Sequence, residues 1–363
     1  MVNLDLDKLL IKAYQLGASD VHLRAKRPPT FRINGRLVKL DAPPLEVATI
    51  DSFVKKILPL EKWKEIPYIK NIDLAYSLPG ICRFRVNIFR QRGTFAIVMR
   101  AIPSEVPEID DLNLPPVVKD IALYRKGLVL VTGITGSGKS TTLAAMLNEL
   151  NKKESRVVIT IEDPIEYLHK DKKSVFYQRE IGTDADDFLT ALRAALREDP
   201  DVILVGEMRD TETVKTALDA AETGHMVFST LHTLDAKETV NRIVSFFPLD
   251  QQQVVRFQLA SVLRATISQR LIPRADGKGR VPAVEVMIVT DAIRERIINP
   301  ELTREIPSFI EKGKEVYGSQ TFDQSLYDLW KKGLITKEDA LKYASKPDDL
   351  RLKIEGIVSS GMF

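Results

Sequence analysis

The feature that most constrains how this chain folds is a glycine-rich segment at residues 133–140. It reads Gly-Ile-Thr-Gly-Ser-Gly-Lys-Ser and fits the pattern G-x-x-x-x-G-K-[ST] of a phosphate-binding loop. An apolar run at residues 127–131 precedes it, and residues 141–150 favour a helix. In this order the glycines turn backbone N–H groups toward a phosphate, and the helix adds the positive end of its dipole. The segment therefore predicts an α/β domain with a nucleotide site; a loop that merely turns the chain is the alternative.

Each residue of the loop has an expected part in binding ATP with Mg²⁺. Lys139 is expected to reach the β- and γ-phosphates as a point charge, and the Ser140 hydroxyl to bind Mg²⁺. The expected nucleotide-binding residues are Gly133, Ile134, Thr135, Gly136, Ser137, Gly138, Lys139, Ser140, Thr141 and His225.

Short apolar runs recur after the loop, at residues 157–161, 202–205 and 226–230, and amphipathic helical stretches separate them. Unbroken apolar runs of this length are typical of strands buried on both faces of a parallel sheet. Ligands of such sheets bind at the carboxyl ends of the strands. The residues that follow these runs are therefore the candidates for catalysis.

Acidic side chains follow two of the runs. Glu207 comes after the run at 202–205 and is expected to hold Mg²⁺, directly or through water. Glu162 ends the run at 157–161 and is expected to orient or deprotonate the attacking water. Asp163 and Glu166 follow closely, and either share this task or cap the next helix.

Two histidines flank the run at 226–230. His232 follows it, and His225 precedes it. A histidine near the γ-phosphate can sense it by hydrogen bonding, and we expect this of His232 and His225. Spacing indicates no functional role for His22 or His169.

The chain before the loop has a different organisation. Residues 1–102 combine helical and alternating strand patterns and predict a smaller α+β domain. Prolines 103, 107, 115 and 116 mark residues 103–116 as a linker, expected to act as a hinge. Residues 117–363 form the predicted ATPase domain, mainly helical beyond about residue 250.

The first domain carries a cationic strand pattern at residues 81–104, which contain no acidic residue. Arg83 and Arg85 alternate with apolar residues and lie on one strand face. Such a face can supply an arginine finger to nucleotide phosphates, within one chain or across chains; it can also be a solvated face or a nucleic-acid surface. The expected finger candidates are Arg83, Arg85, Arg90 and Arg92.

Composition narrows the class of protein further. The 363 residues carry 53 basic and 50 acidic side chains, a net charge of +3, which argues against nucleic acid as a partner. The single cysteine excludes an intrachain disulfide. No apolar run reaches about 18 residues, and the first residues lack a signal-peptide core. We expect a cytoplasmic protein without an integral membrane segment.

Four segments together resemble the secretion ATPase superfamily, which drives type II secretion and type IV pili. They are residues 17–23, 161–167, 196–210 and 223–233. Within the superfamily the chain is similar to the retraction ATPases of type IV pili, which share its short two-domain form without a four-cysteine zinc site. Residues 292–298 resemble their C-terminal helix motif, although Glu295 and Arg296 stand where Asn-Leu is usual.

This resemblance implies a PAS-like N-terminal domain and a RecA-like P-loop ATPase core with a helical C-terminal part. It also implies a cytoplasmic homohexameric ring with ATP between domains and subunits, peripheral at the inner membrane on a pilus platform protein. Its implied activity is ATP hydrolysis that powers pilus retraction, and hence twitching motility, by pilin disassembly. The alternatives are an assembly ATPase for pili or type II secretion, a nucleic-acid translocase and a GTP-binding switch.

Overall fold

The computed structural model describes residues 5–33, 35–102 and 105–357, and the chain forms two units. The first unit runs to residue 105 and includes residues 166–168; the second comprises residues 106–165 and the chain from 169 onward.

The first unit contains a six-stranded antiparallel sheet in the order β3-β2-β1-β6-β5-β4. The strands are β1 (Ala18–Arg24), β2 (Thr30–Ile33), β3 (Arg36–Lys39), β4 (Asn71–Leu78), β5 (Cys82–Gln91) and β6 (Thr94–Ile102). The helices are α1 (Leu6–Gln15), α2 (Val47–Ile57) and the 3₁₀ segment η1 (Leu60–Tyr68). This mixture of helices and antiparallel strands agrees with the predicted α+β domain.

One face of this sheet forms the core of the unit. Phe84, Val86 and Ile88 of β5 are buried together with the apolar sides of α1 and α2. The alternate residues of β5 point to the other face; there Arg85 is exposed and Arg83 half-buried. The strand period of two thus separates an apolar core face from a cationic face, as the sequence pattern predicts.

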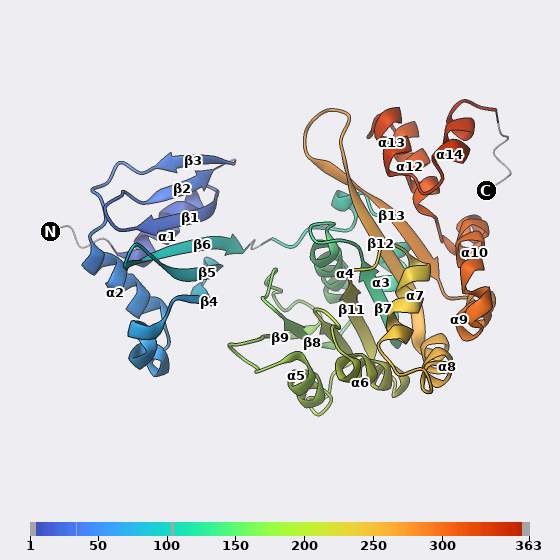
Figure 1. The fold of residues 1–363 in the computed structure, drawn as a ribbon, viewed down its shortest axis with the longest axis horizontal. Helices are drawn as coiled ribbons and strands as arrows, with labels where there is room; N and C mark the ends of the chain where they lie inside the picture. The colour runs from blue at the N-terminus through green and yellow to red at the C-terminus, as the bar shows by residue number, and fades with distance from the viewer. Residues whose placement is uncertain (1–4, 34, 103–104, 358–363) are drawn as a thin grey trace. The chain divides into compact units, whose positions relative to one another are not determined.

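The second unit contains a seven-stranded sheet in the order β13-β12-β7-β11-β10-β8-β9 (Figure 1). Its strands are β7 (Gly127–Thr132), β8 (Val157–Glu162), β9 (Val175–Glu180), β10 (Val202–Val205), β11 (Met226–Leu231), β12 (Leu263–Pro273) and β13 (Arg280–Ile288). Neighbouring strands are parallel except for β13, which is antiparallel to β12. The predicted parallel sheet is therefore confirmed, and all four apolar runs are strands within it.

Helices cover both faces of this sheet. On one face the core includes α3 (Val117–Ala122) and α4 (Lys139–Lys153). On the other face it includes α5 (Phe188–Ala195), α6 (Thr211–Glu222), α7 (Ala236–Ser245), α8 (Gln252–Val262) and α9 (Asp291–Ile298). Burial on both faces explains the unbroken apolar runs, because neither side of a central strand meets water.

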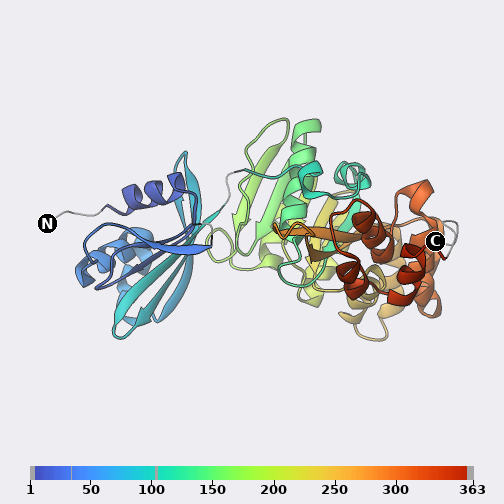
Figure 2. The same cartoon turned by 90° about the horizontal axis from the view of Figure 1, so that it is seen from above.

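The chain beyond residue 250 is mostly helical, as expected, but two long strands interrupt the helices. Strands β12 and β13 add to the edge of the main sheet, and their polar and apolar residues are mixed because their two faces have different neighbours. The later helices are η3 (Pro300–Glu305), α10 (Ile306–Lys312), α11 (Lys314–Tyr317), α12 (Phe322–Lys331), α13 (Lys337–Tyr343) and α14 (Pro347–Ile354). The last three form a group at one end of the unit (Figure 2).

The predicted linker at 103–116 differs from the structure over most of its length. Residues 103 and 104 lie outside the described residues, and 106–116 belong to the second unit. Ile109 and Leu114 are buried in the core of that unit, and η2 (Asp110–Leu112) lies between them. The prolines prevent regular structure, but the apolar residues between them hold the segment against the domain.

Candidate active site

The glycine-rich loop connects β7 to α4, in the predicted strand–loop–helix order. Gly133 has a φ of 140°, and a Cβ there would lie 2.6 Å from the Gln269 carbonyl oxygen and 2.6 Å from Ser137 Oγ. Only glycine tolerates both that backbone conformation and that contact. Glycine at position 133 therefore allows the start of the loop to pack tightly against Gln269 and Ser137.

Lys139 and Ser140 stand at the start of α4, in its first turn. Lys139 Nζ donates to the carbonyl oxygens of Gly133, at 2.8 Å, and Ile134, at 3.2 Å. Ile134, Thr135 and Gly136 are exposed, whereas Ser140 and Thr141 are half-buried. The loop thus exposes residues 134–136, and the lysine amine folds back onto the carbonyls at its start.

The carboxyl ends of the parallel strands lie at the same edge of the sheet as this loop. Leu231 of β11 pairs with Thr132 of β7, and Val205 of β10 pairs with both Ser229 of β11 and Ile161 of β8. The side chains that directly follow β8, β10 and β11 are thereby brought to the loop edge, as the sequence pattern predicts.

Glu207 is the centre of the charged groups at this edge. Its carboxylate lies 2.8 Å from Arg209 Nη2 and 3.0 Å from His232 Nε2. Burial raises the pKa of Glu207, but the hydrogen bond and charge of Arg209, with the charges of His232 and Lys139, outweigh burial and leave the pKa below its usual value. Glu207 is therefore an ionised carboxylate beside the loop, with oxygens that can bind a metal ion.

Glu162 is the last residue of β8, and Gly206, which directly precedes Glu207, packs against its backbone. Gly206 N donates to the Ile161 carbonyl at 2.8 Å, and a Cβ on Gly206 would lie 3.4 Å from Glu162 Cα. Glu162 Oε1 accepts hydrogen bonds from Thr160 Oγ1 at 2.7 Å and Gln178 Nε2 at 3.4 Å. These donors hold one carboxylate oxygen in place.

The two histidines lie at opposite ends of β11. His232 follows β11 and contacts Glu207, but His225 precedes β11, where its Nδ1 lies 3.0 Å from the Ala220 carbonyl and 3.2 Å from Thr223 Oγ1. The 6 residues of β11 span about 20 Å at ~3.3 Å per residue. The expectation that His225 joins the nucleotide site is therefore wrong within one chain: its partners belong to the end of α6.

Asp163 and Glu166 do not cap a following helix. Within the described residues, the chain from 163 to 187 contains β9 and no helix before α5. Asp163 lies near Arg209, whose pKa it helps to raise after the larger effect of Glu207. Glu166 is assigned to the first unit. Glu162 remains the carboxylate that continues directly from its strand into the site.

The arginines of the first unit do not form one set. Arg83 and Arg85 share the outer face of β5, and Arg92 sits in the β5–β6 turn with a φ of 50°. Arg90 belongs to the opposite strand face: its Nε donates to the Ile69 carbonyl at 3.0 Å, and its guanidinium stacks 4.1 Å from the Phe95 ring centroid. Arg90 therefore has a structural role, which leaves Arg83, Arg85 and Arg92 as candidates for an arginine finger.

The cationic face also has an internal partner, which the sequence pattern does not reveal. Asp20 of β1 lies 2.9 Å from Arg100 Nε and 3.7 Å from Arg32 Nε. These strands are adjacent only in the folded sheet, so local spacing gives no sign of the pairing. Arg209 was likewise missed as a partner of Glu207, although it lies only two residues further along the chain.

Two further features concern clusters of metal-binding side chains and helices that could span a membrane. Among described residues there is no group of three or more His, Cys, Asp or Glu side chains that could hold a metal ion. In that same part of the chain, none of the helices has the length and apolar character needed to cross a membrane.

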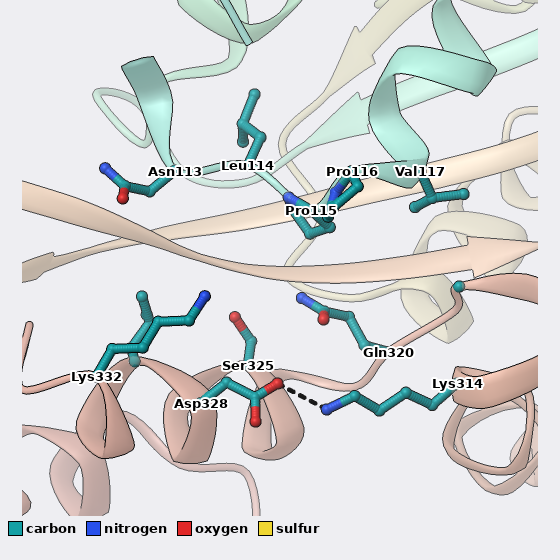
Figure 3. Close-up of a pocket in the computed structure, with 12 residues that line it drawn as sticks. Asn113, Leu114, Pro115, Pro116, Val117, Lys314, Gln320, Ser325, Asp328 and Lys332 are labelled. Atoms are coloured by element: carbon teal, nitrogen blue, oxygen red, sulfur yellow. Dashed lines mark hydrogen bonds and ion pairs between the residues drawn. The ribbon is translucent and has the colours of Figure 1, made fainter. Parts of the chain in front are cut away.

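A cavity of about 370 Å³ lies elsewhere in the second unit (Figure 3). It is located between residues 113–117 and the helices α11 and α12, and its lining includes the ion pair of Lys314 with Asp328 at 2.7 Å. No residue of the glycine-rich loop lines it.

The chain is similar to proteins of pilus and secretion systems over nearly its whole length. Residues 1–321 match the family described as type II/IV secretion system protein. The type IV pilus retraction ATPase PilT of Pseudomonas aeruginosa is 45% identical over 346 residues, covering 95% of this chain and 100% of that protein. The twitching motility protein of Neisseria gonorrhoeae is 44% identical over 322 residues, covering 89% of this chain and 86% of that protein.

A solved structure shares the fold of both units. The crystal structure of the pilus retraction motor PilT with bound ADP matches with a TM-score of 0.87 and 46% identity, covering 96% of this chain and 99% of that chain. The similarity therefore includes the α+β unit and the helical C-terminal part as well as the glycine-rich loop.

Proposed function

The chain belongs to the family of type II/IV secretion system proteins, and from that premise we propose that it is a Mg²⁺-dependent ATPase that powers retraction of type IV pili. The observation that carries the proposal is the convergence of Lys139, Glu207 and His232 at the loop edge of one sheet. The 45% identity to a retraction ATPase over that protein's full length supports the direction of force. It would work as a homohexameric ring in the cytoplasm, peripheral at the inner membrane on a platform protein.

The loop and the first turn of α4 would hold the nucleotide. Backbone N–H groups at a helix N-terminus favour an anion, and the Lys139 amine in the same turn adds a positive charge. Ser140 and Glu207 supply the oxygen donors that Mg²⁺ prefers, and the lowered pKa of Glu207 keeps its carboxylate ionised. When bound, Mg²⁺ would neutralise charge on the phosphates.

Glu162 would orient the attacking water and accept its proton. Glu162 is the last residue of β8, and Thr160 Oγ1 holds one of its carboxylate oxygens at 2.7 Å, as a general base must be held. His232 would connect the γ-phosphate to Glu207, since its imidazole already lies 3.0 Å from that carboxylate. Arg83, Arg85 and Arg92 would stabilise the charge of the transition state from the same chain or a neighbour.

The biochemical test is the substitution Glu162→Gln. It keeps the shape of the side chain and removes the base, so we expect nucleotide binding near that of the wild type and ATP hydrolysis lower by about 100-fold. Both are measured on purified protein, by nucleotide titration and by phosphate release. Unchanged hydrolysis would exclude Glu162 as the base, and stimulation by DNA would favour a translocase.

The cellular test separates retraction from assembly. A strain that lacks this gene is scored for surface pili and for twitching. Abundant pili without movement are expected for a retraction motor, whereas the loss of pili would identify an assembly ATPase.

A further inference from the structure

Strand β12 lies directly behind the glycine-rich loop. It runs parallel to β7, and Ser268 pairs with Thr132, the last residue before the loop. Continuing this register by one residue places Gln269 opposite Gly133. A Cβ on Gly133 would lie only 2.6 Å from the Gln269 carbonyl oxygen, which agrees with that position.

Two neighbouring residues of β12 contact the chain on both sides of the loop. Thr132 Oγ1 donates to Ser268 Oγ at 2.9 Å, before the loop. Gln269 Nε2 donates to Thr142 Oγ1 at 2.7 Å, after the loop and within the first turn of α4. A strand far away in sequence therefore fixes both ends of the segment that must turn around a phosphate.

The Gln269 amide is an uncommon choice for a purely structural position. Gln269 and Thr142 are each 2% exposed. Within the described part of the chain, Gln269 Oε1 has no hydrogen-bond partner. A buried acceptor without a donor destabilises a fold, and an apolar side chain of similar size would avoid that cost. The amide is explained if its N–H bond to α4 serves the site.

Strand β12 is also anchored on its other side. Arg270 donates to the Tyr343 carbonyl at 2.8 Å, and its guanidinium stacks 3.8 Å from the Phe322 ring centroid. The strand is thus held between the loop and the C-terminal helices. It can therefore hold the first turn of α4 in a fixed position relative to the loop.

We propose that Gln269 is a positioning residue of the nucleotide site, which holds the first turn of α4 through Thr142 so that the loop and Lys139 meet the phosphates together. This inference rests on the proposed nucleotide-binding function. The contact acts on the binding of ATP and ADP alike, because it places groups that serve the phosphates common to both. Its loss therefore raises KM more than it lowers kcat.

The test is a double-mutant cycle on the full chain with Gln269→Met and Thr142→Val, which remove either partner and keep its approximate size. ADP and ATP affinities are measured by titration and by the nucleotide-dependent rise in Tm. We expect each single variant to bind about tenfold more weakly. The double variant should also lose about tenfold, not a hundredfold, because both substitutions break one contact.

Two matched variants separate positioning from general effects on packing. Thr142→Ser keeps the hydroxyl and should bind nucleotide nearly as well as the wild type. Thr266→Val removes a buried hydroxyl on the same strand that has no partner among described residues, and should leave affinity unchanged. If Gln269→Met does not fold, the comparison of Thr142→Val with Thr142→Ser decides the question.

Wild-type affinity in the single variants, or an additive hundredfold loss in the double variant, would overturn the role of Gln269. A different result would overturn the proposed function instead: a wild-type chain that binds neither nucleotide, or a Lys139→Ala variant that binds as well as the wild type.

Discussion

Each unit of the protein contains a carboxylate held by cations, and the two differ in what surrounds them. Glu207 lies 2.8 Å from Arg209 and 3.0 Å from His232. Asp20 lies 2.9 Å from Arg100 and 3.7 Å from Arg32, and feels the charge of His22. In both, burial raises the pKa and the neighbouring donors and charges outweigh it, so the pKa lies below its usual value.

The difference lies in the position along the strand. Asp20 sits within β1, between two antiparallel neighbours that supply its partners. Glu207 lies beyond the end of β10, close enough to the glycine-rich loop for the charge of Lys139 to lower its pKa. The charges around Asp20 therefore stabilise the sheet of the first unit. The similar charges around Glu207 are accessible to a ligand. Position at a strand end, more than charge, distinguishes a site from a structural ion pair.

The largest expected effect comes from removing Lys139, the cation of the glycine-rich loop. Lys139→Ala should lower ATP hydrolysis by about 1,000-fold, because no other side chain of the loop supplies a positive charge to the β- and γ-phosphates. Phosphate release by the purified chain measures this. Circular dichroism of the variant serves as the control for folding, and hydrolysis at the wild-type rate would contradict the site.

The two carboxylates can then be compared by isosteric substitution. Glu207→Gln should lower kcat by about 100-fold with little change in Tm, since it removes an ionised oxygen donor from the site. Asp20→Asn should leave kcat unchanged and lower the free energy of unfolding by about 1 kcal/mol, because Arg100 and Arg32 lose a charged partner but remain solvated. Steady-state kinetics and urea unfolding of both variants provide the measurements. If Asp20→Asn lowered kcat as much as Glu207→Gln, the distinction between the centres would be wrong.

A third carboxylate, the buried Glu285, extends the comparison. Glu285 accepts a hydrogen bond from Ala236 N at 2.8 Å. Burial raises the pKa of Glu285 to about 7. The charges of Asp235 and Asp323 raise this pKa further, whereas the bond from Ala236 and the charge of Arg270 lower it. The unfolded chain releases this proton at lower pH than the folded chain does. Stability from Glu285 is thus present at pH 4 and declines as the pH rises toward 7.

Glu285→Gln should remove this decline, which is on the order of 2 kcal/mol. Urea unfolding of both proteins between pH 5 and pH 8 tests it. Parallel pH profiles for the variant and the wild type would show that Glu285 does not titrate in this range.

The smallest expected effect separates the arginines of the first unit. Replacing Arg83, Arg85 and Arg92 together by Ala should lower kcat at least tenfold, if one of them stabilises transition-state charge. Arg90→Ala should leave kcat unchanged and lower stability by about 1 kcal/mol, because it removes hydrogen bonds and stacking within its own unit. ATPase assays and thermal unfolding of both variants decide this. A triple variant with normal kcat would eliminate the arginine finger.

Local pattern was sufficient to predict much of the second unit. The loop, the parallel strands and the positions of Glu162, Glu207 and His232 at one edge follow from apolar runs and from the residues that end them. His225 lies at the other end of β11 within one chain, and an apolar run with a histidine on each side does not show which end faces the ligand. In the folded sheet, His232 follows the carboxyl end of β11, which is the end at the loop.

The sequence by itself determined the type of site, because a glycine-rich turn between a buried strand and a helix leaves few other uses for its backbone N–H groups. It also determined the alternation that separates Arg85 from Phe84. Only the tertiary structure decided which charges meet: Arg100 with Asp20, His232 with Glu207, and Gln269 with Thr142. These partners come from strands or segments that are distant in the chain, and hydrogen-bond register between strands, not local propensity, sets their spacing.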